Sequence, residues 1–392
     1  MKVFVFDMDG VLVDTTGSLF NRYLDFLKGF GKEGSKIEFD ILNGPRLPEI
    51  VAYLKEKYDL GMSEKELLAI YQKKMAGVYD DPKLISGVRE VLKAIQDNRF
   101  KIALASSAPR SAVDKVLPRL DVEFDVIVSG DDVKEAKPSP EIYEAVKKKL
   151  KGEFVVIEDA TNGIESALAA GMEVIAFRNQ HEKAKFEIDD MGELIDIVNG
   201  YRVFRGNIEL ELVEHEVSSE EADRTWEENK KNNPDMFDGK MLAYHDHAIE
   251  DGTIRIWCFL SSYRFFSAGL ISPLSVSGIT IDKQGKILVG RRGRVTEYAD
   301  RDELVPSGSL EHTDYKAQIL KELKEEAGIT NGTVQILGLI HDIDHDVYDI
   351  ACRIQVDRLD PQITAEYSRF SIAESLDGLD LIPTSIALKS LV

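Results

Sequence analysis

Asp7-Met8-Asp9-Gly10-Val11 directly follows the short apolar run Val3–Phe6 at the start of the sequence. Two carboxylates two positions apart lie on one face of a regular strand, and Gly10 permits the chain to bend where the strand ends. Both acids can then reach a cleft at the carboxyl edge of a parallel sheet, where open α/β folds bind ligands. The pair therefore offers a nucleophile, a metal ligand and a general acid or base.

The size and charge of the chain limit what it does. Its 392 residues predict two domains, and a hydrophobic content of 43% is enough for packed cores. A net charge of −21 argues against binding to nucleic acid or to an anionic membrane surface. An anionic substrate remains compatible with this charge, because a bound divalent cation inverts the local field.

The compartment follows from the cysteines and from the apolar segments. Cys258 and Cys352 lie far apart inside apolar segments, which predicts buried free thiols rather than a disulfide framework. The sequence starts directly with a strand-like segment, which is not typical of a signal peptide. No uncharged apolar run approaches the length of a membrane span. We expect a cytoplasmic protein.

The first half of the chain alternates strand-like and helical patterns, which predicts βαβ units and a mostly parallel sheet. The strand-like runs are Val3–Phe6, Ile102–Ala105, Val126–Val128, Phe154–Ile157 and Glu173–Phe177. Between the first two runs the patterns are helical only: Leu19–Lys28, Leu47–Tyr58, Glu64–Ala76 and Val88–Gln96. The block from about Thr15 to Lys83 is therefore predicted to be a helical insertion over the sheet's carboxyl edge, where it can act as a lid.

The pattern changes near Gly200, and we expect a domain boundary at about 198–206. From Tyr201 onward β-branched and aromatic runs predominate, which favours antiparallel strands. These runs are Ile208–Val213, Ile254–Leu260, Val276–Ile281, Ile287–Val289, Val334–Ile340 and Tyr348–Val356. One helical stretch interrupts them, Tyr315–Ala327, and a loop over Pro306–Leu310, expected to be flexible, leads into it.

Polar residues follow the later strands of the first half. Ser106-Ser107 comes after the second strand, Lys137 stands ahead of prolines after the third, and Glu158-Asp159 comes after the fourth. Hydroxyl and lysine donors suit a phosphate group, and paired carboxylates suit Mg²⁺. Four successive strand ends thus carry what metal-assisted phosphoryl transfer requires.

With these motifs the first half resembles the haloacid dehalogenase-like (HAD) superfamily, over residues 1–199 with a cap at about 15–83. The resemblance implies a Rossmann-like core with a helical cap inserted after its first strand. It implies Asp7 as a nucleophile that forms an aspartyl-phosphate, and Asp9 as the general acid and then base. It also implies Mg²⁺ on Asp7, Asp159 and the Asp9 backbone carbonyl, with Glu158 in the outer shell. Ser106, Ser107 and Lys137 would bind the phosphoryl group.

Two further positions bear on the kind of HAD enzyme. The second acid, Asp9, is lacking in the dehalogenase and phosphonate-cleaving branches. Leu19 stands where the mutase-like branch has a cap histidine, so hydrolysis of a phosphomonoester is favoured and a sugar phosphomutase is the alternative. In the cap stretch Asn43-Gly44-Pro45-Arg46, Arg46 is a candidate to grip a second anionic group, and a plain surface arginine is the alternative.

In the second half, Glu322, Glu325 and Glu326 cluster along one face of the predicted helix Tyr315–Ala327. Three clustered carboxylates repel one another unless cations neutralise them, and oxygen ligands suit Mg²⁺ or Mn²⁺. The alternative is a solvated surface helix with Lys321 and Lys324 as the partners of the glutamates.

This helix resembles the Nudix box, because residues 321–329, KELKEEAGI, match its second half with Lys321 in place of arginine. The first half departs: at the family's spacing Ser307 replaces the glycine and Thr313 the acid. The resemblance implies an α/β/α-sandwich Nudix domain over 200–392 that cleaves a nucleoside diphosphate linked to another moiety. It implies metal on Glu322, Glu325 and Glu326, with water activated there by Glu325 and Glu326. Trp226 and Gly290-Arg291-Arg292 are similar to Nudix enzymes that act on UDP-sugars.

Together the two resemblances predict a bifunctional, Mg²⁺- or Mn²⁺-dependent phosphohydrolase acting on phosphomonoesters and on nucleoside-diphosphate conjugates. Three alternatives stay open: a Nudix module that senses a nucleotide without cleaving it, a phosphomutase, and a Nudix fold that serves as a homodimerisation platform.

Overall fold

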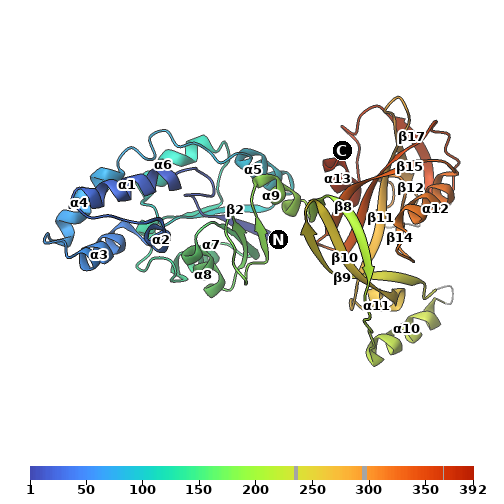
Figure 1. Cartoon of the computed structure of the whole chain (residues 1–392), viewed down its shortest axis with the longest axis horizontal. Helices are drawn as coiled ribbons and strands as arrows, with labels where there is room; N and C mark the ends of the chain where they lie inside the picture. Colours follow the sequence, from blue (N-terminus) through green and yellow to red (C-terminus); the bar gives the residue numbers. More distant parts are fainter. Residues whose placement is uncertain (234–236, 294–297, 365) are drawn as a thin grey trace. The chain divides into compact units, whose positions relative to one another are not determined.

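The computed structural model describes residues 1–233, 237–293, 298–364 and 366–392. The chain divides into two compact units, Met1–Val198 and Asn199–Val392 (Figure 1). Cys258 and Cys352 are both buried and free, which confirms the prediction for the thiols. Among the described helices, none combines the length and the apolar character that crossing a membrane requires.

The N-terminal unit is built on a six-stranded sheet in the order β3-β2-β1-β4-β5-β6, with all neighbours parallel. This confirms the predicted parallel α/β core and adds a short sixth strand. The strands are β1 (Lys2–Phe6), β2 (Lys101–Ala105), β3 (Val126–Val128), β4 (Glu153–Glu158), β5 (Glu173–Phe177) and β6 (Phe186–Ile188). Because β1 is central, the chain leaving it emerges between the ends of β2 and β4.

Helices cover this sheet and bury its branched side chains. One core cluster joins Val3, Val5 and Val156 of the sheet to Tyr143 and Ile164 of the helices α7 and α8. The helices that follow the cap are α5 (Val88–Asp97), α6 (Arg110–Val116), α7 (Glu141–Lys149), α8 (Thr161–Ala169) and α9 (Met191–Val198), with 3-10 turns η1 (Leu117–Arg119) and η2 (Gly130–Asp132).

The segment between β1 and α5 forms a helical cap with a core of its own. Its helices are α1 (Thr16–Lys28), α2 (Lys36–Ile41), α3 (Leu47–Tyr58) and α4 (Glu64–Met75). Tyr23, Phe26, Phe39, Leu54 and Leu67 form the centre of this separate cluster, and α1, α3 and α4 lie together in Figure 1. The cap is therefore a packed body that can cover the edge of the sheet.

The C-terminal unit contains a mixed sheet of eleven strands among its described residues. The strands are β7 (Tyr201–Arg205), β8 (Asn207–Leu212), β9 (Lys240–Glu250), β10 (Thr253–Ser262), β11 (Ser272–Ile281), β12 (Ile287–Arg292), β13 (Asp302–Leu304), β14 (Ser307–Ser309), β15 (Thr333–Asp342), β16 (Val347–Gln355) and β17 (Tyr367–Ala373). The prediction of antiparallel strands is wrong for two pairs, since β11–β16 and β8–β10 are parallel.

Two helices pack on opposite faces of this sheet. Ile319 and Leu323 of α12 (Tyr315–Ala327) share a cluster with Ile350 of β16, whereas Leu388 of α13 (Pro383–Ser390) shares a second cluster with its neighbour Ala351. Successive residues of a strand point to opposite faces, so the sheet lies between the helices. The remaining helices are α10 (Glu220–Asn232) and α11 (Tyr263–Ser267).

The segment ahead of α12 is not the flexible loop that the sequence suggests. Ser307–Ser309 forms strand β14, which pairs with β11. Gly308 lies so close to α12 that a Cβ atom on it would stand 2.5 Å from the carboxyl carbon of Glu322. A side chain at this position would displace the Glu322 carboxyl group, so glycine lets the segment pack directly against the acidic helix.

Candidate active site

Asp7 and Asp9 lie where β1 ends, at the carboxyl edge of the parallel sheet. The Asp7 amide donates to the Ile157 carbonyl at 3.0 Å and so continues the β1–β4 ladder. Gly10 turns the chain with a φ of 82°, and a Cβ atom there would stand 2.0 Å from Asp159 Oδ2. Only glycine satisfies both the backbone and the close approach of the second acid pair.

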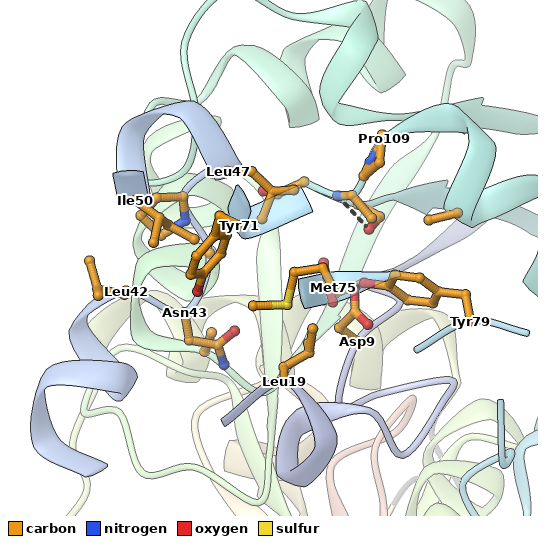
Figure 2. A pocket seen from close by; sticks show the side chains of 18 of the residues that line it. Asp9, Leu19, Leu42, Asn43, Leu47, Ile50, Tyr71, Met75, Tyr79 and Pro109 are labelled. Carbon is orange, nitrogen blue, oxygen red and sulfur yellow. Dashed lines mark hydrogen bonds between the residues drawn. The ribbon is translucent and has the colours of Figure 1, made fainter. Parts of the chain in front are cut away.

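The acids open onto a cavity of about 380 Å³ between the core and the cap (Figure 2). Of the residues predicted to act in catalysis, metal binding or phosphate binding, Asp7, Asp9, Ser106, Ser107, Glu158 and Asp159 line it. The Ala108 amide donates to Ser106 Oγ at 3.1 Å, which orients that hydroxyl while its hydrogen can be donated to a ligand. Residues from three neighbouring strand ends therefore meet at one site.

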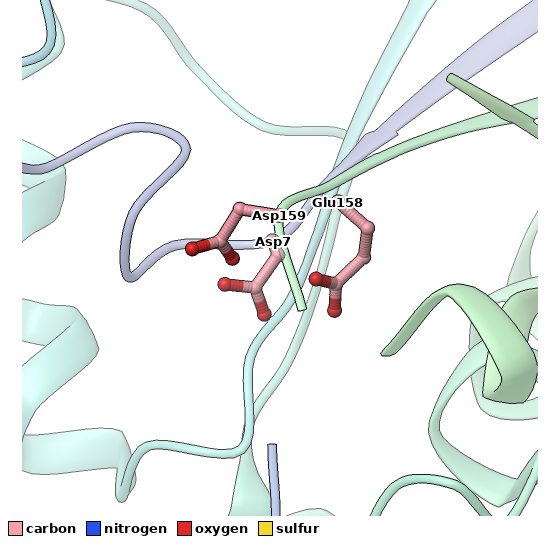
Figure 3. A group of neighbouring side chains, drawn as sticks. All are labelled: Asp7, Glu158 and Asp159. Carbon is pink, nitrogen blue, oxygen red and sulfur yellow. The ribbon is translucent and has the colours of Figure 1, made fainter. Parts of the chain in front are cut away.

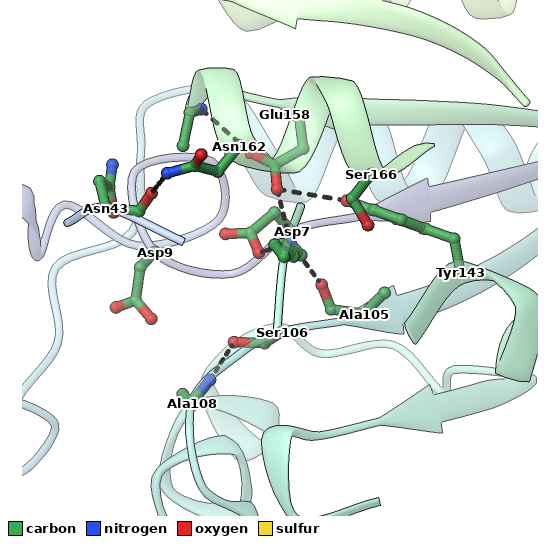
Figure 4. Close-up of polar contacts among 12 residues, drawn as sticks. Asp7, Asp9, Asn43, Ala105, Ser106, Ala108, Tyr143, Glu158, Asn162 and Ser166 are labelled. Carbon is green, nitrogen blue, oxygen red and sulfur yellow. Dashed lines mark hydrogen bonds and ion pairs between the residues drawn. The ribbon is translucent and has the colours of Figure 1, made fainter. Parts of the chain in front are cut away.

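Lys137 is buried beside the acids and does not line the cavity. Its Nζ lies 2.6 Å from Asp7 Oδ1, 2.5 Å from Glu158 Oε1 and 3.2 Å from the Ala105 carbonyl oxygen. Figure 4 labels these three partners. All three ammonium hydrogens thus have partners in the protein. In this arrangement Lys137 fixes and neutralises the carboxylates, and its contact with a phosphoryl group stays a prediction.

Burial sets the protonation of the acids. Burial raises the pKa of Asp7 to about 7, and the charges of Glu158 and Asp9 add to this although Lys137 opposes them. Burial followed by the charges of Glu158 and Asp7 raises the pKa of Asp159 as well. For Lys137, burial alone lowers the pKa of the ammonium, but the charges of Asp7 and Glu158 outweigh it and raise the pKa.

The acid cluster fits a divalent cation. Asp7, Glu158 and Asp159 each offer an oxygen within 4.8 Å of the others, which makes them a candidate metal group among the described residues (Figure 3). Mg²⁺ prefers such hard oxygen ligands, and a cation would relieve the repulsion between these carboxylates, which adds to the effect of burial on the pKa of Asp7 and of Asp159. Glu158 already accepts from Lys137, Tyr143 and the Ala160 amide, so its contacts suit an outer position better than direct ligation.

Arg46 is placed away from the cavity lining. Its guanidinium donates to the Glu49 carboxylate, to the Val133 carbonyl at 2.8 Å and to the Lys134 carbonyl. These bonds join the start of α3 in the cap to a loop of the core. In this arrangement Arg46 bridges cap and core, and its contact with a second anionic group stays a prediction.

Two residues that the sequence did not single out hold Asp9. Thr15 Oγ1 donates to Asp9 Oδ1 at 2.5 Å, and Tyr79 Oη donates to Asp9 Oδ2 at 3.1 Å. Both flank the cap, one before α1 and one after α4. Burial raises the pKa of Asp9, and these two bonds oppose the rise. Tyr79 is 70 residues from Asp9 in the sequence, and no local sequence signal points to this contact.

The acidic helix of the C-terminal unit is arranged differently. Among the described residues, the carboxylate oxygens of Glu322, Glu325 and Glu326 do not all lie within 4.8 Å of one another. Glu325 is exposed, and Glu322 accepts from Gln318 at 2.6 Å. Glu326 is buried, where the Ser307 amide donates to it at 3.1 Å and Tyr367 Oη lies 3.1 Å away.

Comparisons with known proteins bear on the N-terminal unit. A protein described as a phosphorylated carbohydrates phosphatase from Thermotoga maritima is 37% identical over 184 residues, which are 45% of this chain and 84% of that protein. The pyrophosphatase PpaX of Halalkalibacterium halodurans is 29% identical over 212 residues, which are 50% of this chain and 95% of that protein. A crystal structure of beta-phosphoglucomutase from Clostridium difficile is 24% identical, with 49% of this chain and 92% of that chain covered and a TM-score of 0.45.

The family model for haloacid dehalogenase-like hydrolases matches residues 4–177, which span β1, the cap and the strand ends that carry Ser106, Lys137 and Glu158-Asp159. With the parallel sheet, the acid cluster and a relative at 37% identity in agreement, the chain belongs through its N-terminal unit to the haloacid dehalogenase-like hydrolases.

Proposed function

We propose that the N-terminal unit hydrolyses a phosphomonoester, with Asp7 as the nucleophile and Asp9 as the general acid and base. The observation that carries this proposal is the convergence of Asp7, Asp9, Ser106 and Asp159 on one cavity. A carboxylate oxygen of Asp7 attacks phosphorus, the bond from phosphorus to the ester oxygen breaks, and Asp9 protonates the departing alcohol. Water then attacks the aspartyl-phosphate, Asp9 takes its proton, and inorganic phosphate leaves with Asp7 restored.

The surroundings of each acid support its proposed role. Burial raises the pKa of Asp9, which favours the protonated form that a general acid needs at the first step. Lys137, at 2.6 Å, fixes the Asp7 carboxylate, and Ser106 and Ser107 are the hydroxyl donors for the phosphoryl oxygens. Asp7 and Asp159 would hold Mg²⁺, which when bound supplies positive charge against the phosphoryl oxygens.

An acid-quench experiment tests the nucleophile. The full chain is mixed with phenyl phosphate labelled in the phosphoryl group, in Mg²⁺, and quenched in acid. We expect label on the wild-type protein and on Asp97→Asn, a surface control, and none on Asp7→Asn. Label on Asp7→Asn at the wild-type level would exclude Asp7 as the nucleophile. A strict requirement for a sugar bisphosphate activator would instead identify a phosphomutase.

For the C-terminal unit we propose a Nudix-like domain spanning 200–392 that binds a nucleoside diphosphate linked to another moiety, such as a sugar, and cleaves it with Mg²⁺. The sheet between α12 and α13 and the close packing of Gly308 on Glu322 support this proposal. The buried position of Glu326 favours the alternative of a nucleotide-binding module without turnover.

The two proposals for this unit differ in one measurement. Nucleotide-sugars and other nucleoside-diphosphate conjugates are offered, with Mg²⁺ or Mn²⁺, to an Asp7→Asn variant whose phosphatase site is silent. Cleavage that is lost on a further Glu325→Gln change supports a Nudix hydrolase. Binding detected by calorimetry without cleavage supports the non-catalytic module.

A further inference from the structure

The cap presents a hydrocarbon surface to the catalytic acids. The cap side chains that line the cavity are mainly apolar: Leu19, Leu42, Leu47, Ile50 and Met75, which Figure 2 shows, and Phe39. They come from α1 and α4, from α2 and the stretch that follows it, and from the first turn of α3. The leaving group of a bound monoester occupies this side, because the phosphoryl group must lie on the acids.

Polar partners for that leaving group are few. Of the cap residues that the structure describes along the cavity, Asn43 and Gln72 have an amide side chain, and Tyr71 and Tyr79 have a hydroxyl group. The Tyr79 hydroxyl already donates to Asp9. The one cationic lining residue in the described part of the chain is Lys115, which belongs to α6 of the core and not to the cap. Lys115 is 52% exposed and pairs with Asp80 at 2.6 Å, which places its charge toward solvent.

The cation of the cap loop is already engaged. Arg46 donates to Glu49 and to the carbonyls of Val133 and Lys134, and the hydrogen bond with Glu49 raises the pKa of its guanidinium. A second phosphate on the substrate would therefore meet leucine and isoleucine side chains in place of a positive charge. A chain with a hydroxyl group on every carbon would carry more hydroxyl groups than Asn43, Gln72 and Tyr71 can partner, and it would bury the others without hydrogen bonds.

We propose that the substrate is a monophosphate of an uncharged and mainly hydrocarbon alcohol, aliphatic or aromatic. This inference rests on the proposed phosphatase activity and names its substrate class. The proposed substrate class differs from the one in the name of the Thermotoga maritima relative, which refers to phosphorylated carbohydrates. Because each buried methylene adds apolar contact, we expect kcat/KM to rise about fourfold for every methylene added to the leaving group, until the cavity is filled.

The experiment compares substrates of equal length on the full-length wild-type protein in Mg²⁺. Hexyl phosphate and a hexitol phosphate share a six-carbon chain and differ in hydroxyl groups. We expect kcat/KM to rise from ethyl to butyl to hexyl phosphate, and to be about 100-fold higher for hexyl phosphate than for the hexitol phosphate, the effect of two buried hydroxyls without partners. A hexose bisphosphate should be the poorest substrate.

Variants then assign the preference to the cavity wall. Met75→Gln should lower the ratio of hexyl to hexitol phosphate turnover about tenfold, whereas Met75→Leu keeps it. Met62→Gln makes the same change in the cap cluster at a residue outside the cavity lining and should leave the ratio unchanged.

Two failures are distinguishable. If no phosphomonoester is hydrolysed, the proposed function itself is wrong. If the hexitol phosphate is hydrolysed as fast as hexyl phosphate or faster, the phosphatase stands and the apolar substrate class is overturned.

Discussion

Replacing Lys137 by methionine tests whether its ammonium holds the acid cluster together. Methionine keeps an unbranched chain of similar length but removes the charge. The lysine side chain is 1% exposed, and its ammonium contacts both Asp7 and Glu158. The variant therefore leaves two carboxylates close together in the interior with no cation between them.

The size of the effect follows from this burial. Removing one partner of a buried ion pair destabilises a protein by about 3–5 kcal/mol, because the remaining charge stays buried and uncompensated. For a unit of this size, Met1–Val198, each kcal/mol shifts the melting temperature by roughly 2–4 °C. We expect the N-terminal unit of Lys137→Met to melt about 6–20 °C lower at pH 8 without metal.

The loss should depend on pH and on metal. Burial raises the pKa of Asp7 to about 7, above its value in the unfolded chain. Lys137 opposes this rise, so the pKa of Asp7 should be higher still in Lys137→Met. Ionisation of Asp7 therefore costs the variant more stability than the wild type as the pH rises above about 7, whereas at pH 5 Asp7 is protonated in both proteins and this part of the loss disappears. Mg²⁺ should also recover part of the loss, since it supplies a positive charge at the same carboxylates.

Differential scanning calorimetry of the full chain measures both units, and tryptophan fluorescence isolates one of them. The sequence has two tryptophans, and both Trp226 and Trp257 lie in the C-terminal unit. Their transition should not move in Lys137→Met. The matched control is Lys93→Met, which breaks a surface pair with Asp97 in which the lysine is 71% exposed; such pairs contribute about 0–1 kcal/mol.

The reasoning is refuted if Lys137→Met and Lys93→Met lower the melting temperature of the N-terminal unit equally at pH 8. A loss that persists unchanged at pH 5 and in Mg²⁺ would also refute it. That result would trace the effect to packing and not to charge.

Two further predictions concern single hydroxyl and carboxyl groups. Tyr79→Phe removes a hydrogen bond to Asp9 that favours the charged carboxylate, so the pKa of Asp9 should rise and the alkaline limb of the kcat/KM profile should move to higher pH. The control Tyr71→Phe, in the same cavity, should leave the limb in place, and a fall in rate with no shift of the limb would indicate a structural role only. Burial raises the pKa of Glu326 to about 9, so the stability that this group gives the folded state is present below its unfolded pKa and is lost as the pH rises toward 9. Glu326→Gln should therefore raise the melting temperature of the C-terminal unit, followed by tryptophan fluorescence, at pH 8 but not near pH 4, and an equal effect at both pH values would contradict the protonated state.

The parallel core could be predicted because its strands are buried on both faces and appear as continuous apolar runs. The order of the strand ends along the chain then placed the acids, hydroxyls and lysine at one edge. The sequence pattern predicts a helix less clearly where few of its side chains are buried. Helix α2 exposes Ile37 and Ile41 and buries Phe39, so it has no apolar stripe, and α10 is charged throughout most of its length.

Contacts between distant residues could not be predicted from spacing. Nothing around Tyr79 indicates that its hydroxyl reaches Asp9, and the direction of β16 against β11 is not encoded in alternation. Arg46 is different, because a local signal existed. Glu49 stands three residues later, at the position where an acidic side chain caps a helix start. This spacing could have predicted the ion pair between Arg46 and Glu49, whereas the positive charge of Arg46 alone suggested an anion ligand.

Helix α12 shows how one face of a helix decides the role of an acid. Ile319, Leu323 and Ala327 define its buried face, and Glu326 lies on that face beside Ala327. The Tyr367 hydroxyl has one hydrogen but lies 3.0 Å from a Glu303 oxygen and 3.1 Å from a Glu326 oxygen.

One of these two contacts therefore needs a proton on the carboxyl group. Arg292 forms an ion pair with Glu303 at 2.6 Å, so the proton belongs on Glu326, in agreement with the pKa that burial raises to about 9. A neutral acid is a poor metal ligand, and a cation could recruit Glu326 only by displacing this proton. Metal-dependent chemistry on this helix should consequently strengthen as the pH rises, which a site built from the exposed Glu325 alone would not do.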